Sequence, residues 1–508
     1  MRPLVVAMLL LGALVLWPSY VQKTHLVYQG VGGDDFCYFA HASSLAYLQW
    51  PDYRLELTCR GEYPMASIGP GLLAAPFVFV FSLLDRLAGH AIVHVRAPDN
   101  VVGTWSVFGF EMATAFYFGL TCLLLFQLAR RRVPELVASW SVVLMVLCQG
   151  TLLYVWRRPI FSHVFELFTL TALLFALDHR AHLPVEQRSR WRWSVLVGTA
   201  CALAALTRYN NVPIAAAWPL IFGHFLGTAD GRRQEVRFIA RTVVVALPWL
   251  LVFKVIPTLM AREEKYAGEA LGVILKGLAV TEWPRRFGWF LLGDDWGLVF
   301  TAPFVLVAVV GLVMVRFPDR RVYAWLAATL LVNLYLTVNF GSQGGFYGYR
   351  YFVFSAMPVL LVPFAHFLEA STRRRPLHTR VMMVLMAIPP LVSMGLFEGN
   401  DTNLAMRLTP QWGRSDWGVA HFQREVWSTI LNHPAQALMI LFKGVPAYAA
   451  FLVASLVGME HVLPAVLREK FSPVSWLLLG EVLALWVTPV LTILVTTRLA
   501  ARMRRAQP

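Results

Sequence analysis

The sequence predicts an all-α, polytopic transmembrane protein, and two observations lead to this fold class. First, 58% of the 508 residues are hydrophobic and only 14% are charged, whereas a soluble chain carries about 25% charged residues. Second, apolar runs of roughly 17 to 25 residues, the length that crosses ~30 Å of hydrocarbon, recur along the chain. Such spans must be helical, because lipid offers no partner for a free backbone amide.

The formal net charge of +15 is carried largely by short arginine clusters between the apolar runs. This pattern indicates membrane topology and not nucleic-acid binding, because Lys and Arg stay on the cytoplasmic side of a membrane. The clusters expected there are 130–132, 188–192, 232–233, 316–321, 373–375 and 498–505. The longer polar segments then face outward, so chemistry is expected at the outer membrane surface.

Taken in order, the expected spans are 3–19, 104–129, 135–156, 159–178, 193–227 as two short helices, 238–256, 297–315, 322–338, 351–370, 381–397 and 474–497. The run 193–227 is too long for one span, and an outer turn at 208–211 divides it. Residues 64–84 hold several prolines and glycines, which suit a regular span poorly, so they are expected on the outer interface; 434–457 are similar. This gives about twelve spans. The alternative is thirteen or fourteen, with one basic cluster on the wrong side.

The sharpest motif is Gly32-Gly33-Asp34-Asp35-Phe36-Cys37-Tyr38, which follows the first span and precedes an apolar-patterned helix. Asp34 or Asp35 can cap that helix, serve as a general base, or hold a divalent metal through oxygen ligands. Cys37 and Cys59 share this first outer loop (20–103). They can pair if the loop faces an oxidising compartment, and two free thiols are the alternative.

Arginines also lie at helix ends that are expected to face outward. This position is unusual, because Lys and Arg favour the cytoplasmic side, and it requires an explanation. Arg208 lies in the turn between two short spans, Arg350 opens a span after a glycine-rich stretch, and Arg158 precedes Pro159. Binding an anionic ligand is one reason, because guanidinium grips phosphate with a fork of donors; snorkelling to headgroups is the other. His163 lies one turn before Glu166 in an expected span. Because an ionisable side chain inside a membrane costs free energy, His163 is a functional candidate.

Together these features resemble the C-type glycosyltransferase superfamily (GT-C), whose members include protein O-mannosyltransferases and the aminoarabinose transferase that modifies lipid A. The stretches that carry the resemblance, besides the acidic motif, are 62–71 with Ala75-Pro76, Ser162-His163, Leu206-Thr207-Arg208, 297–303 and 344–351. It covers most of residues 1–400, which are interpreted as the catalytic transmembrane region. Residues 401–508 add a C-terminal outer loop and membrane segments and match no known pattern.

The resemblance implies transfer of a sugar from a polyprenyl-phosphate donor to a lipid, glycan or protein acceptor, at the periplasmic face of a bacterial inner membrane. Asp34 or Asp35 is then the general base, and Arg208, Arg350, Arg158 and His163 hold the donor phosphate. Glu62, Tyr63 and Tyr349 line the donor or acceptor groove. No cofactor is required; a divalent Mg or Mn ion enters only if the two aspartates are ligands. The lysine that some members place in the 63–65 region is absent here.

Two other functions fit the same composition. A transporter or lipid flippase is the first, although it would place ionisable residues near the bilayer midplane and show inverted repeats. An O-antigen ligase or polymerase is the second. It would use basic residues in one late outer loop, where 398–433 carry Arg407, Arg414 and Arg424.

Overall fold

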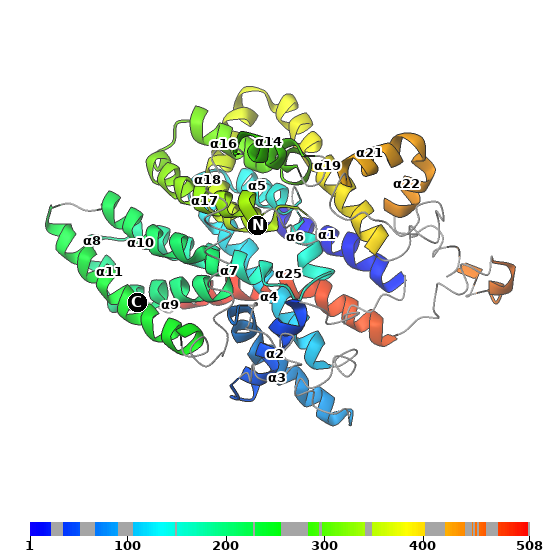
Figure 1. Ribbon diagram of the computed structural model, residues 1–508, viewed down its shortest axis with the longest axis horizontal. Coiled ribbons are helices and arrows are strands. Elements are labelled where there is room, and N and C mark those ends of the chain that lie inside the picture. The colour runs from blue at the N-terminus through cyan, green and yellow to red at the C-terminus, as the bar shows by residue number, and fades with distance from the viewer. Residues whose placement is uncertain are drawn as a thin grey trace.

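The structure, a computed structural model, describes residues 1–21, 34–50, 67–89, 105–147, 150–226, 229–255, 283–293, 297–340, 348–401, 422–441, 450, 453–454, 457–463 and 476–505. Over these ranges all regular secondary structure is helical, which confirms the predicted all-α class (Figure 1). In chain order the helices are α1 Arg2–Val21, α2 Asp34–Ala46, α3 Gly69–Leu87, α4 Trp105–Arg130, α5 Glu135–Leu147, α6 Thr151–Trp156, α7 His163–Ala181, α8 Val185–Arg188, α9 Trp191–Thr207, η3 Tyr209–Asn211, α10 Val212–Leu226, α11 Ala229–Leu250, η4 Leu251–Val255, α14 Trp283–Leu292, α15 Leu298–Thr301, α16 Phe304–Met314, α17 Arg320–Phe340, α18 Arg350–Arg374, α19 Pro376–Asp401, α21 Phe422–Asn432, α22 Pro434–Leu441, η6 Glu460–Val462 and α25 Trp476–Arg505.

Six helical stretches in the described part of the chain are long and apolar enough to cross a membrane, by length and composition. They are Gly69–Leu87, Trp105–Arg130, Gly231–Phe253, Arg350–Arg374, Pro376–Gly395 and Leu479–Met503. Shorter apolar helices, among them α5, α9 and α16, accompany them. The protein is therefore a polytopic helical protein as predicted, and the figure of about twelve spans stays a prediction.

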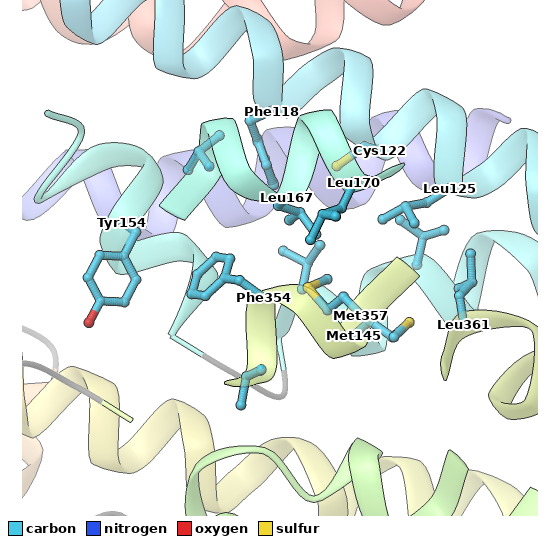
Figure 2. Packing of buried hydrophobic residues seen from close by; sticks show 14 of the residues in the cluster. Phe118, Cys122, Leu125, Met145, Tyr154, Leu167, Leu170, Phe354, Met357 and Leu361 are labelled. Carbon is cyan, nitrogen blue, oxygen red and sulfur yellow. The ribbon is translucent and has the colours of Figure 1, made fainter. Parts of the chain in front are cut away.

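The helices α4, α7 and α18 form the centre of the bundle. In α18, 89% of the apolar stretch is buried, whereas 17% of the stretch within α11 and η4 is buried, so α11 lies at the periphery. Figure 2 shows the packing, in which side chains of α4, α7 and α18 such as Phe118, Leu167 and Met357 point toward one another. A hydrogen bond from Trp486 Nε1 to Leu9 O (2.6 Å) ties the last helix, α25, to α1.

Several of the predicted basic clusters lie at one end of the bundle, called the basic end here, and Arg188 joins them through the bond from Arg180 Nε to its carbonyl oxygen (3.0 Å). Arg132, just after α4, bonds Asp178 of α7 and also Asp319, just before α17, the latter at 2.7 Å. Arg180 of α7 makes a bidentate pair with Glu235 of α11 at 2.8 and 2.9 Å. These contacts place 130–132, 232–233 and 316–321 on the same face, as the topology requires. Which side of the membrane this face meets stays a prediction.

The run 193–227 is divided as predicted. Helix α9 ends at Thr207, residues Tyr209–Asn211 form the 3-10 helix η3, and α10 begins at Val212. Arg208 has an extended backbone between α9 and η3 (φ −155°, ψ 132°). The turn therefore places Arg208 at the end of the bundle opposite the basic end, called the site end here.

Residues 64–84 were expected on the outer interface because their prolines and glycines suit a regular span poorly. The described part of this stretch nevertheless belongs to a helix that is long and apolar enough to cross a membrane. Helix α3 is continuous from Gly69 to Leu87. Pro70 lies in the first turn, where amides have no intrahelical acceptor, so only Pro76 removes a backbone hydrogen bond. Helix α3 runs antiparallel to α4, since Asp85 accepts hydrogen bonds from the backbone amides of Trp105 (2.7 Å) and Ser106 (2.8 Å). Whether α3 crosses the membrane or lies on its surface stays a prediction.

Candidate functional site

Arg208 is the first element of the candidate site, and two residues at the start of α7 hold it. Its Nε lies 3.2 Å from Glu166 Oε2 and donates a hydrogen bond to Ser162 Oγ, also 3.2 Å away. The Glu166 side chain is fully buried, while that of Arg208 keeps 11% of its surface exposed. Burial of a carboxylate is tolerated when it is paired, so Glu166 fixes the guanidinium while leaving part of it accessible.

Arg350 is the second element, at the first position of α18. The chain reaches it through Gly348, whose φ of +73° favours glycine. Arg350 is 4% exposed, and its Nη2 donates a hydrogen bond to the Tyr351 hydroxyl at 3.2 Å. The guanidinium of Arg208 lies over the Tyr351 ring, 4.2 Å from its centroid. Tyr351 therefore contacts both arginines, which come from segments about 140 residues apart in the sequence.

His163 is the third element and lies in an aromatic environment. Its ring stacks on Phe354 (5.1 Å between centroids) and meets Tyr154 edge-on (4.6 Å). The distance from His163 Nδ1 to Glu166 Oε2, 3.9 Å, is too long for a hydrogen bond. Neither ring nitrogen has a hydrogen-bond partner among the described residues. His163 therefore has unused hydrogen-bonding capacity beside the arginines.

A small hollow lies next to Arg350 and is lined mainly by the ends of α6, α15 and α18. The lining residues are Gly150, Tyr154, Thr301, Ala302, Gly348, Tyr349, Arg350, Val353 and Phe354. In Figure 2 the Tyr154 hydroxyl points away from the aliphatic packing. Tyr349, predicted as a groove residue, lines the hollow, and its hydroxyl donates to Trp289 O of α14 at 3.4 Å.

The start of α3 joins helix α2 to the Arg208 turn. A Cβ on Gly69 would come within 2.6 Å of the backbone of Leu206 and Thr207, and a Cβ on Gly71 within 2.4 Å of His41 Cβ in α2. Only glycine permits both approaches. His41 is fully buried there, and this burial lowers its pKa to about 4 despite a hydrogen bond with the Ser67 backbone. The acidic motif's helix is thus packed, through α3, against the segment that carries Arg208.

The predicted site residues divide into two groups. The structure brings Arg208, Arg350, His163 and Tyr349 together at the site end, and Arg158 lies in the turn between α6 and α7 near Phe161, which contacts Arg350. Asp34 and Asp35 open α2, but their side chains lie outside the described residues, as do Glu62 and Tyr63 entirely. The roles of these four residues stay predictions.

Cys37 is disulfide-bonded, whereas Cys122 and Cys201 are free. The partner of Cys37 is not among the described residues, and Cys59 is outside them. The pairing of Cys37 with Cys59 therefore stays a prediction, while the alternative in which both cysteines of the loop are free thiols is wrong for Cys37.

Sequence reasoning missed two members of this group, Tyr154 and Tyr351. Tyr351 directly follows Arg350, so an aromatic residue beside an arginine at a span end was the available signal. Tyr154 carried no comparable signal, because hydropathy does not distinguish an aromatic residue facing a site from one packed in a core. Among the described residues of this group, Arg208 and Arg350 face one carboxylate, Glu166, so this part of the site carries net positive charge and suits an anion.

A different set of residues has the geometry of a metal site. Ligand atoms of Asp178, His182 and Asp319 lie within 4.8 Å of one another at the basic end. Arg132 bonds both carboxylates, and Arg131 Nη1 lies 2.7 Å from Asp178 Oδ2. Because guanidinium groups occupy the carboxylate oxygens and repel cations, we interpret this set as an ion-pair network. The predicted metal ligands, Asp34 and Asp35, are not part of it.

Comparisons with known proteins add one likeness. No protein-family model matches the chain, and no curated protein matches it. Among solved structures, the chain is similar to the archaeal oligosaccharyltransferase AglB from Archaeoglobus fulgidus, in complex with an inhibitory peptide and a dolichol-phosphate. The TM-score is 0.46 and the sequence identity 14%, over 80% of this chain and 58% of that one. The chain thus spans a little over half of the length of AglB.

Proposed function

We propose that this protein is a membrane glycosyltransferase that takes a sugar from a polyprenyl-phosphate donor and transfers it to an acceptor hydroxyl. The observation that carries the proposal is the arrangement of Arg208 and Arg350 around Tyr351 at one end of the bundle. Guanidinium groups bind phosphate with a fork of donors, and ionisable groups set inside a membrane bundle often mark a ligand site. A phosphate on a lipid would reach this end of the bundle from the membrane.

The two arginines would act on the leaving group. The acceptor oxygen attacks the anomeric carbon, the bond from that carbon to the phosphate oxygen breaks, and the phosphate leaves with the electron pair. Guanidinium groups aimed at the oxygen that gains charge stabilise such a transition state. Glu166 and Tyr351 hold the guanidinium of Arg208 in place before the donor binds, so little reorganisation is needed.

The acceptor proton would go to a carboxylate of the acidic motif, Asp34 or Asp35. The supporting geometry is the position of α2, which begins at Asp34 and packs on α3, while α3 touches the Arg208 turn at Gly69. A base and a leaving-group site carried by neighbouring helices suit a one-step displacement. Metal ions enter this scheme only if both aspartates serve as ligands.

The finer assignments are also part of the proposal. The site end faces the periplasm of a bacterial inner membrane, because the opposite end carries the arginine clusters. The sugar is a hexose or pentose, and the acceptor a lipid, glycan or protein, as the resemblance to GT-C enzymes implies. Arg158 and His163 would assist phosphate binding, and Glu62, Tyr63 and Tyr349 would line the groove.

The test is transfer of radiolabelled sugar in membranes from a panel of polyprenyl-phosphate, polyprenyl-diphosphate and nucleotide donors. We expect transfer from a monophosphate lipid, lost in Asp34→Asn or Asp35→Asn while the protein still inserts. Glu186→Gln, an exposed change at the basic end, is the matched control. Full activity in both aspartate variants contradicts the proposed base, and transfer from diphosphate donors only favours the ligase or polymerase alternative.

One observation favours a transporter or lipid flippase as the second candidate. His163 and Glu166 are completely buried at the start of α7, and ionisable groups inside a bundle mark transport pathways as well as active sites. The two functions separate in the same membranes, because a flippase moves a labelled lipid across the bilayer without changing its sugar, whereas a transferase releases the lipid phosphate.

A further inference from the structure

The basic end of the bundle carries a groove that the proposed reaction does not use. It has a volume of about 670 Å³ and is lined by His179 of α7 and by Arg192, Trp193, Val195, Leu196 and Thr199 of α9. The groove is open to the surface, so it suits a ligand that extends beyond it and not one that is fully enclosed. Along α9, Arg208 lies about 24 Å from Arg192 and about 14 Å from Thr199, the two ends of the groove, at 1.5 Å per residue. None of the groove residues lies beside Arg208 or Arg350, so the groove is a different site.

The side of α9 that lines this groove begins with a charged residue, Arg192, and continues with the apolar residues Val195 and Leu196. Arg192, Val195, Leu196 and Thr199 recur at helical spacing and share a face. Val195 is 41% exposed and Leu196 50% exposed, and α9 is one of the shorter apolar helices of the bundle. In a bilayer, an exposed apolar wall of this kind would contact acyl chains, and an arginine at its end would reach the headgroups.

Arg192 is the charged group available at this end. Its guanidinium lies over the neighbouring Trp193 ring, 5.3 Å from the centroid, and it has no ion-pair partner among the residues that the structure describes. Arg131, by contrast, is 2.7 Å from Asp178. Arg192 thus offers its forked donors to an incoming anion, in the manner that suits phosphate.

His179 supplies a second donor. Its Nδ1 lies 2.6 Å from Arg131 Nη2. A guanidinium only donates hydrogen bonds, so Nδ1 must accept, and the proton of the neutral imidazole is then on Nε2. The His179 ring packs against Phe175 (6.0 Å) and Trp193 (5.3 Å). This packing holds the ring at the groove, where Nε2–H can meet an anionic oxygen.

From these contacts we infer that the groove between α7 and α9 binds an anionic glycerophospholipid of the leaflet at the basic end. Arg192 and His179 hold the headgroup phosphate, and the acyl chains lie along Val195 and Leu196. Basic pockets between membrane helices on the positively charged side bind anionic headgroups in this way. The site lies at the other end of the bundle from Arg208 and does not depend on the proposed transferase activity.

The experiment is native mass spectrometry of the purified protein titrated with dioctanoyl-phosphatidylglycerol. Dioctanoyl-phosphatidylcholine and glycerol phosphate serve as the neutral-headgroup and chain-free probes. We expect the phosphatidylglycerol adduct to form at lower concentration than either probe. In Arg192→Gln its affinity should fall by at least about tenfold, the loss of one charge-assisted contact. Leu196→Gln should weaken the lipid but not glycerol phosphate.

Arg190→Gln is the matched control, because Arg190 is exposed, lies two residues away and does not line the groove. It should leave the affinity unchanged. Equal losses in Arg190→Gln and Arg192→Gln would overturn the site in favour of general surface charge. Equal binding of glycerol phosphate and of phosphatidylglycerol would overturn the lipid assignment, and unaltered binding in Arg192→Gln would overturn both.

Discussion

Gly69→Ala tests the contact by which α3 supports the Arg208 turn. The added Cβ would lie 2.6 Å from Leu206 C, Leu206 O and Thr207 N. Ordinary contact begins near 3.4 Å, so α3 and the end of α9 must separate by roughly 0.8 Å, and all three obstructing atoms are backbone. Overpacking of this kind costs about 1–3 kcal/mol, and a displacement near 1 Å at a reacting group can cost about 100-fold in rate.

The assay compares thermal unfolding and sugar transfer in wild type, Gly69→Ala and Gly480→Ala. Gly480 is the control because a Cβ there meets nothing within 4 Å; alanine should leave unfolding unchanged or improve it slightly. We expect Gly69→Ala to unfold earlier and to lose transfer activity well beyond its loss of folded protein. Wild-type unfolding and transfer in Gly69→Ala would refute the reasoning that this contact positions Arg208.

Three further predictions concern single side chains. Glu166→Gln removes the carboxylate that pairs with Arg208, which should cost about 3 kcal/mol of stability. In a double-mutant cycle measured by thermal unfolding, the variant that carries both Glu166→Gln and Arg208→Gln should lose less stability than the two single variants lose together. Additive losses would show that the two side chains are not coupled. Asp85→Ala removes the acceptor of two backbone amides at the start of α4 and should cost about 1–2 kcal/mol, and an unchanged unfolding midpoint would contradict that. His41 has a pKa near 4 when folded against 6.5 unfolded. The unfolded state therefore binds more protons, and stability should fall between pH 6.5 and 4 by at most about 3 kcal/mol. In His41→Asn the fall in stability between pH 6.5 and 4 should be smaller. A pH dependence of unfolding identical to that of wild type would show that His41 is not its source.

Hydropathy and charge predicted the helices and their grouping because membrane spans have a fixed length and a charge bias. The turn at Arg208 and the shared basic end, with Arg132 bonded to Asp319, are examples. Hydropathy and charge alone place Arg208 and Arg350 only on the same face of the membrane, and their assignment to one phosphate site came from the resemblance to GT-C enzymes. Which helices are neighbours depends on side-chain packing, and an apolar helix has no single face marked for burial.

That α3 would be regular and long enough to cross a membrane was not predicted, for a related reason. Proline and glycine lower helix propensity, but tertiary packing overrides it. Here Gly69 and Gly71 are needed because the backbone of α9 and His41 of α2 come so close. A single sequence does not distinguish a glycine that ends a helix from a glycine that lets another helix pack closely.

The most direct test of the central claim is sugar transfer from a polyprenyl-phosphate donor by Arg208→Gln and Arg350→Gln proteins. Arg374→Gln is the control, an exposed arginine at the other end of the helix that Arg350 opens. We predict that each site variant loses about 100- to 1,000-fold in transfer rate, as when one donor to a developing anion is removed, while Arg374→Gln matches wild type. Wild-type transfer by both folded site variants would contradict the account.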